Sequence, residues 1–419
     1  MPGKMKVIIL GAGVMGVCTA YLLAKQGFEV TVIDRHTYAA MESSYANGCQ
    51  LSYSHCEPWA TGGNLIKAIK WLGHKEAPLL FRLRWDWDMY KWLTKFIINA
   101  MPANVARNTL NILKLSFYSR YIMHELLDEF DFDFDFQKSG ILHLFHNKEE
   151  LDKAERHFIF ESRNSDELKF KVLSAKQCLN LEPAVAHIIK EKYGGIYFPK
   201  DEIGDILKFT RGLAAMCIKL GVKFLYNTDI LTLTLSGNRI SGVNTNQGFY
   251  TADKFVMALG AYSGKFMRMI GINLPIYPMK GYSISIPVRK KHEHLSMSIT
   301  DQKSKIVYVP LKGFLRAAGT VEFAGFNHEI LAERIDPIVN ATRRSFPDGG
   351  DFDKVVPWAC LRPQTPQSSP IIGRTRYNNL FINSGHGSLG WTQALGSSKI
   401  VADVIVGKSP EISLTGLKL

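Results

Sequence analysis

The apolar positions near the start of the chain predict a strand, a helix and a second strand in close succession. Residues 6–10 form a short run rich in β-branched side chains, and an apolar-periodic stretch through 21–26 stops at Gly27. A second apolar run over 30–33 ends in Asp34. Short β-branched runs are typical of strands, and apolar spacing near 3.6 residues is typical of helices. The sequence therefore predicts a βαβ unit at its beginning.

Further along, the same patterns predict a strand-rich chain interrupted by helices. Strands are predicted over 136–146, 222–226, 230–235, 239–244, 255–259, 282–286, 306–309, 314–323 and 380–383. Helices are predicted over 64–101 in large part, over 107–130, from Asp205 to Gly221, and from Asp336 and Pro337 to near Pro347. Asp205 is a suitable N-cap and Gly221 a suitable C-terminal stop. Strand-rich stretches thus alternate with α/β pieces, which indicates two interleaved domains.

The composition is that of a folded protein with a basic balance of charge. Lys and Arg (51) exceed Asp and Glu (38) by 13, and the excess is spread along the chain. This balance favours anionic partners, but no finger, RNA-recognition or basic-zipper signature accompanies it, so we expect no nucleic acid. The six cysteines form no CxxC pair and lack the histidine spacing of zinc sites, so neither a disulfide framework nor a metal is indicated.

The sequence also bears on the location of the protein. It opens almost directly into a strand, without the pattern of a secretory leader. It contains no run of about 18 apolar residues that would span a bilayer. We therefore expect a cytoplasmic protein whose contact with a membrane, if it has one, is peripheral.

A glycine-rich turn between the first strand and the first helix is the first candidate site. Gly11, Gly13 and Gly16 form a GxGxxG motif, and Asp34 ends the second strand. Glycines allow a tight turn and close approach to a diphosphate, and the helix N-terminus supplies amide donors. A carboxylate at Asp34 suits a ribose diol. The context predicts a dinucleotide site.

Three further segments could contact the same dinucleotide. The polar loop over 43–50 follows Asp34, and the strand over 255–259 ends in small residues at 258–261. The loop over 385–390 precedes the last helix and could direct amide groups and a helix dipole at a negatively charged ring. The residues that we expect to contact the cofactor are Val7, Ile8, Ile9, Leu10, Gly11, Ala12, Gly13, Val14, Met15, Gly16, Asp34, Arg35, Ser43, Ser44, Asn47, Gly48, Gln50, Ala258, Gly260, Gly385, Gly387, Ser388, Leu389 and Gly390.

Several motifs, far apart but in a fixed order, resemble one family of flavoproteins. They are MKVIILGAGVMGVCTAY, ESSYANG, IKWLGHKEAPL, YPMKGYSISIP and CLRPQTPQSSPIIGRTRYNNLFINSGHGSLGWTQALG. Together they resemble bacterial D-amino-acid dehydrogenases of the small-subunit type, within the glycine oxidase and D-amino-acid oxidase group of FAD-dependent oxidoreductases. The similarity covers nearly the whole chain.

The resemblance implies a fold and a division into domains. We expect an α/β fold in which a Rossmann-like FAD-binding domain is interleaved with an α+β substrate domain on a mostly antiparallel sheet. The FAD-binding domain is expected over 1–85, 168–275 and 345–419. The substrate-binding domain is expected over 86–167 and 276–344.

The resemblance also implies an activity and its site residues. It implies noncovalent FAD, oxidative deamination of D-amino acids to 2-oxo acids and ammonia, and electrons passed to a membrane quinone. Arg362, between Leu361 and Pro363, matches the arginine that clamps the substrate carboxylate in glycine oxidases. Tyr282 is a second catalytic candidate, a possible donor to the carboxylate, but Ile284 and Ile286 share its face and make a core role equally compatible.

Several alternatives stay open at this level. A glycine or sarcosine oxidase that uses oxygen, or a catalytically silent flavin-binding protein, fits the same motifs. Cys360 stands where sarcosine oxidases tether their flavin, so it is either an attachment site or a buried structural thiol. The segment over 64–101 carries seven aromatic residues, seven Lys or Arg and three acids, and it is either a membrane-side surface or an aromatic core.

Overall fold

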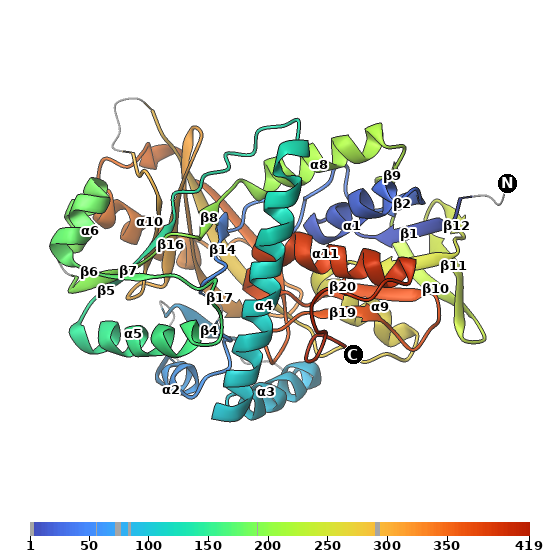
Figure 1. Cartoon of the computed structure of the whole chain (residues 1–419), viewed down its shortest axis with the longest axis horizontal. Helices are drawn as coiled ribbons and strands as arrows, with labels where there is room; N and C mark the ends of the chain where they lie inside the picture. The colour runs from blue at the N-terminus through green and yellow to red at the C-terminus, as the bar shows by residue number, and fades with distance from the viewer. Residues whose placement is uncertain (1–3, 56, 72–76, 83–84, 191, 290–293) are drawn as a thin grey trace.

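The computed structural model describes residues 4–419 except 56, 72–76, 83–84, 191 and 290–293. Figure 1 shows two sheet-based parts side by side, with the long helix α4 (Pro102–Leu126) crossing between them. None of the described helices offers an apolar stretch sufficient to span a bilayer.

The first part is a six-stranded sheet built around the βαβ unit that the sequence predicts. Its order is β19-β20-β13-β1-β2-β9, and all neighbours are parallel except β19 and β20. The strands are β1 (Lys6–Leu10), β2 (Glu29–Ile33), β9 (Lys223–Leu225), β13 (Lys254–Met257), β19 (Ile371–Arg374) and β20 (Leu380–Ser384). Helices α1 (Val14–Lys25), α8 (Ile206–Lys219) and α11 (Gly390–Val406) cover one face. The other face packs on α9 (Ser263–Met269) and on the small sheet of β10 (Ile230–Ser236), β11 (Arg239–Thr245) and β12 (Gly248–Tyr250).

The second part is a larger, mostly antiparallel sheet of the order β18-β14-β17-β16-β15-β5-β7-β6, with β4 paired to β17. Its strands are β4 (Leu79–Phe81), β5 (Ile141–Phe145), β6 (Lys171–Ser174), β7 (Gly194–Phe198), β14 (Tyr277–Pro287), β15 (Ser298–Asp301), β16 (Ile306–Leu311), β17 (Phe314–Phe323) and β18 (Val356–Gln364). One face packs on α6 (Ala175–Leu181), α7 (Ala186–Ile189) and α10 (Ala332–Ser345). The opposite face is turned toward the first part, and residues of both parts line one cavity.

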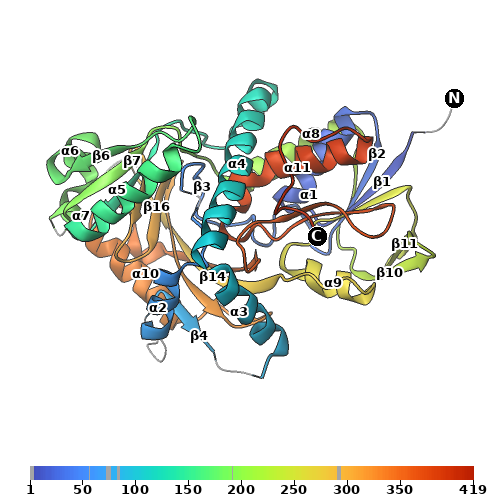
Figure 2. The same ribbon diagram turned by 60° about the horizontal axis from the view of Figure 1, so that its bottom comes forward.

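The remaining elements surround the junction of the two parts. They are β3 (Gln50–Leu51), which pairs with β8 (Glu202–Ile203), and the helices α2 (Gly62–Trp71), α3 (Trp87–Asn99) and α5 (Lys148–Ser162). Figure 2 shows α2 and α3 on the same side of the molecule, below the large sheet.

The α/β fold class is confirmed, and the sheet that four strands join differs from the one that the expected domain boundaries imply. β7 pairs with β5, and β6 pairs with β7, so both strands belong to the large sheet, although we expected 168–275 in the FAD-binding domain. β4 and β18 join the same sheet from segments that were also assigned to FAD binding. Strand pairing over long sequence separations follows from tertiary packing, so local patterns do not reveal which sheet a strand joins.

The predicted start of one helix is correct, and the predicted start of another is wrong. α8 begins as expected, because the Asp205 carboxylate accepts hydrogen bonds from the amides of Leu207 (2.8 Å) and Lys208 (3.2 Å). α10 was expected to open at Asp336 and Pro337 but begins at Ala332, with Pro337 inside it. Proline there removes one hydrogen bond to the carbonyl of Glu333, an exposed residue near the helix end where water can replace it.

Candidate functional site

A large cavity lies between the two sheets. It has a volume of about 1240 Å³ and runs from the glycine turn after β1 across the face of the large sheet. Small-molecule sites usually enclose about 300–1,000 Å³. The cavity therefore has room for a dinucleotide together with a small substrate.

The three glycines of the turn have different structural roles. Gly11 has φ +107°, and a Cβ there would lie 2.6 Å from the carbonyl oxygen of Ala258. A Cβ at Gly16 would lie 1.9 Å from the carbonyl oxygen of Gly11. A Cβ at Gly13 would instead meet only the Ser44 Oγ, at 3.6 Å, and would point into the cavity. Gly11 and Gly16 are thus required by the fold, whereas Gly13 keeps space for a ligand next to the N-terminus of α1.

Asp34 and Ser44 hold polar groups at the same end of the cavity. The Asp34 carboxylate accepts hydrogen bonds from the amides of Ala12 (2.7 Å) and His36 (2.8 Å). Burial raises the pKa of Asp34 from its ordinary value. Ser44 Oγ accepts a hydrogen bond from the Val14 amide at 3.1 Å, in the first turn of α1. A carboxylate has further lone pairs, so Asp34 can also accept hydrogen bonds from a ribose diol.

The loop after Asp34 joins the glycine turn to the large sheet. Ser43 Oγ donates to the carbonyl of Leu361 (2.8 Å) on β18. Gln50 Nε2 donates to the hydroxyls of Ser298 (2.8 Å) and Thr300 (3.0 Å) on or beside β15. Asn47 accepts from the Cys49 amide with its side-chain oxygen, at 2.8 Å. The loop therefore forms a wall along the middle of the cavity.

The glycine-rich segment before α11 closes the cavity opposite the loop. Gly385 and Gly387 have φ values of +87° and +55°, a conformation that glycine adopts without strain. The turn that they form directs the start of α11 at the cavity, where Gly387, Ser388, Leu389 and Gly390 line it. His386 also lines the cavity. Burial lowers the pKa of its ring to about 3, so the ring is neutral at pH 7. Helix amides and a positive dipole end thus face the ligand space.

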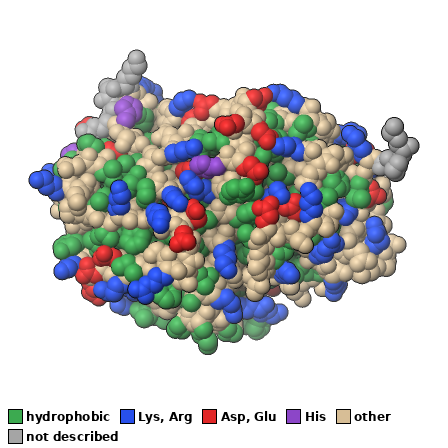
Figure 3. Space-filling model, in the orientation of Figure 1, with side chains coloured by type: hydrophobic (Ala, Val, Ile, Leu, Met, Phe, Trp, Pro, Cys, Tyr) green, Lys and Arg blue, Asp and Glu red, His purple; other side chains and the backbone are tan. Residues whose placement is uncertain are grey.

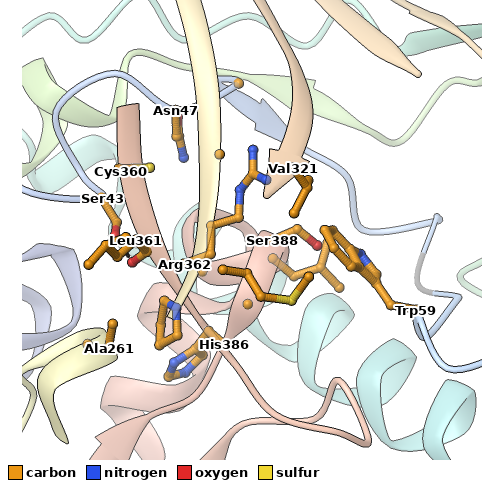
Figure 4. A pocket seen from close by; sticks show the side chains of 18 of the residues that line it. Ser43, Asn47, Trp59, Ala261, Val321, Cys360, Leu361, Arg362, His386 and Ser388 are labelled. Carbon is orange, nitrogen blue, oxygen red and sulfur yellow. Dashed lines mark hydrogen bonds between the residues drawn. The ribbon is translucent and has the colours of Figure 1, made fainter. Parts of the chain in front are cut away.

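Arg362 extends from β18 into the cavity over the neighbouring strand β14. A Cβ at Gly281 would lie 2.3 Å from the Arg362 Cζ, so the absence of a side chain there makes room for the guanidinium. Figure 4 shows Arg362 between Leu361 and Cys360 on one side and Val321 and Trp59 on the other. Burial lowers the pKa of Arg362, and no described carboxylate pairs with it.

The surroundings of Arg362 favour a bound anion. Arg362 is partly buried, and its guanidinium, which pairs with no described carboxylate, retains its charge and its N–H donors because arginine stays protonated in proteins. A carboxylate can satisfy those donors in a bidentate pair. The cavity thus contains a carboxylate receptor on the side of the large sheet.

Tyr282 also lines the cavity, but its hydroxyl is engaged with a protein carboxylate. Successive residues of a strand point to opposite faces, and the neighbouring Gly281 faces Arg362. The Tyr282 ring packs in the core with Ile284 and Ile286, and its hydroxyl donates to Glu322 at 2.5 Å. The role of this hydroxyl as a donor to substrate stays a prediction, and it would require the hydroxyl to leave Glu322.

This placement gives a direct prediction for Tyr282→Phe. We expect kcat/KM for an amino-acid substrate to stay within about twofold of the wild type, because the hydroxyl already donates its hydrogen bond to Glu322. We expect the free energy of unfolding to fall by ~1.5–3 kcal/mol, since a hydrogen bond to a buried carboxylate is lost. Steady-state kinetics and denaturant titration measure the two effects. A selective loss of activity at unchanged stability would restore Tyr282 to the catalytic site.

Most of the expected cofactor residues lie on the cavity wall, but seven do not. Val7, Ile8, Ile9 and Leu10 are buried in the sheet cores on either side of β1, so they support the turn and do not contact a ligand with their side chains. The other residues behind the wall are Ala12, Gly16 and Gly385. The expected residues that line the cavity are Gly11, Gly13, Val14, Met15, Asp34, Arg35, Ser43, Ser44, Asn47, Gly48, Gln50, Ala258, Gly260, Gly387, Ser388, Leu389, Gly390, Tyr282 and Arg362.

Cys360 lies on the wall beside Arg362 as a free, buried thiol. Burial raises its pKa, which keeps it protonated and unreactive at neutral pH. This environment favours a structural thiol over a flavin attachment site. The other described cysteines are also free and buried, and Cys56 lies outside the described residues.

Sequence analysis missed several residues of the cavity. Met279 and Gly281 line it from β14. Side chains alternate between the two faces of a strand, so the assignment of Tyr282 to one face could have directed attention to Met279 and Gly281 on the other. Trp59 and Val321 lie near Arg362, and no local motif marks them. Distant strands and loops bring these residues together, so only the folded chain identifies them.

Comparisons with known proteins identify the family. Residues 6–404 match the family model described as FAD dependent oxidoreductase. The chain is 44% identical over 414 residues to a D-amino acid dehydrogenase of Paramagnetospirillum magneticum, covering 99% of this chain and 98% of that protein. It is 39% identical over 415 residues to a D-amino acid dehydrogenase of Rhizobium rhizogenes, with 99% of both covered.

A solved structure shows the same fold. Glycine oxidase from Geobacillus kaustophilus superposes with a TM-score of 0.78 at 20% identity, with 99% of both chains covered. The family match spans nearly the whole chain, and the FAD that its description names fits the glycine turn, Asp34 and the start of α11 described above. The chain belongs to the FAD-dependent oxidoreductase family.

Proposed function

We propose that the protein catalyses oxidative deamination of D-amino acids of the D-alanine type. One amino acid, one quinone-type acceptor and one water give a 2-oxo acid, ammonia and the two-electron-reduced quinol. Bound FAD supplies the acceptor atom, N5, for the hydride that leaves the substrate Cα. Arg362 is the observation that carries the proposal, and the name of the curated relatives supports the choice of D-amino acids.

Arg362 orients the substrate. Two parallel N–H donors of its guanidinium grip both oxygens of the carboxylate, which leaves the Cα only limited freedom to rotate. Fixing the Cα–H in one direction is the main catalytic task left to the protein, because positioning alone accounts for a large part of the barrier reduction. The guanidinium occupies the space above Gly281, which any larger side chain at that position would fill.

The walls near Arg362 select the side chain. Met279, Trp59 and Val321 line this part of the cavity and offer apolar surface. An apolar side chain gains free energy by leaving water for such a surface, whereas a charged side chain loses its hydration there. Small aliphatic D-amino acids therefore fit best.

The start of α11 stabilises negative charge. Its amides and dipole face the part of the cavity between the glycine turn and Arg362. Preorganised donors of this kind favour the charge that develops in hydride transfer, by the same physics as an oxyanion hole. We assign this role to the backbone of residues 387–390, and no role to the neutral His386 ring.

We further propose a quinone-type acceptor and a place on the inner face of the cytoplasmic membrane. The resemblance to D-amino-acid dehydrogenases supports both, and so does the exposed basic and aromatic surface analysed below. Oxygen as the acceptor would instead make the protein a glycine or sarcosine type of oxidase.

Anaerobic mixing with amino acids tests the proposed reaction. We expect D-alanine to bleach the visible absorbance of the protein-bound flavin, while L-alanine, glycine and sarcosine leave it unchanged over the same time. Re-oxidation of the bleached protein should be faster with a soluble quinone than with air-saturated buffer. Bleaching by glycine or sarcosine, with rapid re-oxidation by air, would favour the oxidase. No bleaching by any of the four would contradict an amine-oxidising function.

A further inference from the structure

An exposed apolar surface lies on the side of the molecule formed by α2 and α3. We call it the α2–α3 face and define it by Ile66, Ile69, Trp85, Trp87, Tyr90, Ile97, Ile98 and Met101. Trp85 is 80% exposed, Ile69 69% and Trp87 61%. Figure 3 shows hydrophobic side chains together with Lys and Arg along the lower edge, where Figure 1 places α2 and α3. Exposed apolar clusters of this kind mark interaction sites.

The α2–α3 face resolves the two interpretations of the segment over 64–101. Part of the segment is core: Met89 and Trp92 are buried, and the Trp92 indole donates to the carbonyl of Gln364 at 2.9 Å. The other part is exposed and includes Trp85 and Trp87. These two rings contact each other edge to face, with 5.2 Å between their centroids. The segment therefore both completes the core and forms a surface.

The charges around the α2–α3 face are basic. Lys67, Lys70, Lys91 and Lys95 are exposed, and none pairs with a described acid. The two described acids of the segment are engaged, since Asp86 caps α3 and Asp88 pairs with Arg268 at 2.8 Å. The surface thus presents aromatic and aliphatic side chains among ammonium groups that pair with no acid in the described part of the chain. Tryptophan and lysine in this combination suit the headgroup region of a bilayer.

The cavity reaches the surface at the same place. Ile69 of α2 and Tyr90 and Ile97 of α3 line the cavity and are also exposed, so one mouth lies between the two helices. Leu65, Leu93 and Phe96 continue its apolar lining inward. A molecule that enters here from an apolar phase meets apolar side chains along the way.

We propose that the α2–α3 face is the surface by which this protein lies on an anionic bilayer, with the mouth of the cavity toward the lipid. An apolar acceptor then passes from the bilayer into the cavity without crossing water. The acceptor part rests on the proposed function, whereas the docking surface does not. A second copy of the chain is a poorer occupant, because a two-fold contact would bring the four lysines of each copy together.

Vesicle sedimentation of the full-length, FAD-loaded protein tests the surface. We expect binding to vesicles that contain phosphatidylglycerol, weaker binding to pure phosphatidylcholine, and release by added salt. Lys91→Glu with Lys95→Glu should lower binding by more than tenfold, since one lysine near an anionic surface contributes about fivefold. Trp85→Ser with Trp87→Ser should weaken binding at all salt concentrations, because it removes apolar burial rather than charge.

A matched control uses exposed hydrophobic residues elsewhere. Phe249 on β12 and Ile218 on α8 are 52% and 58% exposed and lie far from α2 and α3. Phe249→Ser with Ile218→Ser should bind vesicles like the wild type. Equal loss in the control and the tryptophan variant, or no wild-type binding to anionic vesicles, overturns the proposal. A wild-type dimer that the tryptophan variant loses assigns the face to a second copy.

Activity separates this inference from the proposed function. None of the substituted residues lines the cavity, so D-alanine oxidation with a soluble dye should be unchanged in every variant. Reduction of a long-chain benzoquinone dissolved in the vesicles should fall in parallel with binding. If the wild type lacks dye-linked oxidation, the proposed function fails while the sedimentation result still tests the surface. If quinone reduction persists without vesicle binding, the route through the α2–α3 mouth is wrong.

Discussion

Replacing Arg362 with methionine is expected to lower kcat/KM for D-alanine by about 10²- to 10³-fold, because truncating one partner of a buried charge pair costs ~2–5 kcal/mol. The guanidinium has no described carboxylate partner, so the substrate is the group that satisfies it. Stopped-flow measurement of flavin bleaching gives the effect on the reductive step. FAD content should equal that of the wild type, since Arg362 lies on the side of the large sheet and away from the glycine turn.

The same substitution carries a second, opposite expectation for stability. An unpaired charge inside the protein has lost hydration without gaining a salt bridge, so an apolar residue of similar length relieves that cost. We expect the Tm of substrate-free Arg362→Met to be equal to or above that of the wild type. Arg362→Lys serves as the control, because it keeps the charge but lacks the planar fork. The activity of Arg362→Lys should fall between that of the wild type and that of Arg362→Met. A less stable Arg362→Met with normal activity would show that Arg362 is a structural residue.

Gly13→Ala is expected to weaken FAD binding by at least about 100-fold, equivalent to ~2.7 kcal/mol, while the protein stays folded. The added methyl group meets no protein atom closer than the Ser44 Oγ at 3.6 Å, and it occupies the space through which a diphosphate approaches the start of α1. Flavin content after purification and isothermal titration of the apoprotein with FAD measure the loss.

Gly16→Ala is the matched comparison. Its Cβ would lie 1.9 Å from the Gly11 carbonyl oxygen, so α1 cannot keep its place against β1. We expect insoluble or strongly destabilised protein, seen by circular dichroism and thermal unfolding. Both variants should lack flavin, but only Gly13→Ala should yield a folded, colourless protein. If the two behave alike, the distinction between a fold-bearing and a ligand-facing glycine is wrong.

The nucleotide end of the site was predictable because it is local. One βαβ unit contains Gly11, Gly13, Gly16 and Asp34. Strand pairing, helix geometry and a hydrogen bond to Asp34 set their relative positions within that unit. The cap of α8 at Asp205 was predictable for the same reason. Arg362 was found through resemblance, because an arginine between leucine and proline has no local signature of carboxylate binding.

Long-range pairing decided the substrate end. The alternation over 282–286 predicted a strand, which in the structure extends over Tyr277–Pro287, but which of its faces meets the cavity depends on what packs against it. α10 covers the face with Tyr282, and Arg362 from β18 covers the face with Gly281. A shift by one residue exchanges the two faces, so the pattern alone left Tyr282 as a candidate.

The family, the cofactor end and most strands and helices therefore follow from short-range patterns and motifs, since these record backbone geometry and capping chemistry within single elements. Only the folded chain reveals three other features: the membership of β6 and β7 in the large sheet, the space above Gly281, and the cavity mouth between α2 and α3. Each depends on surfaces that are distant in sequence and meet only when apolar area is buried between them. That burial is cooperative over the whole molecule, and no local segment encodes it.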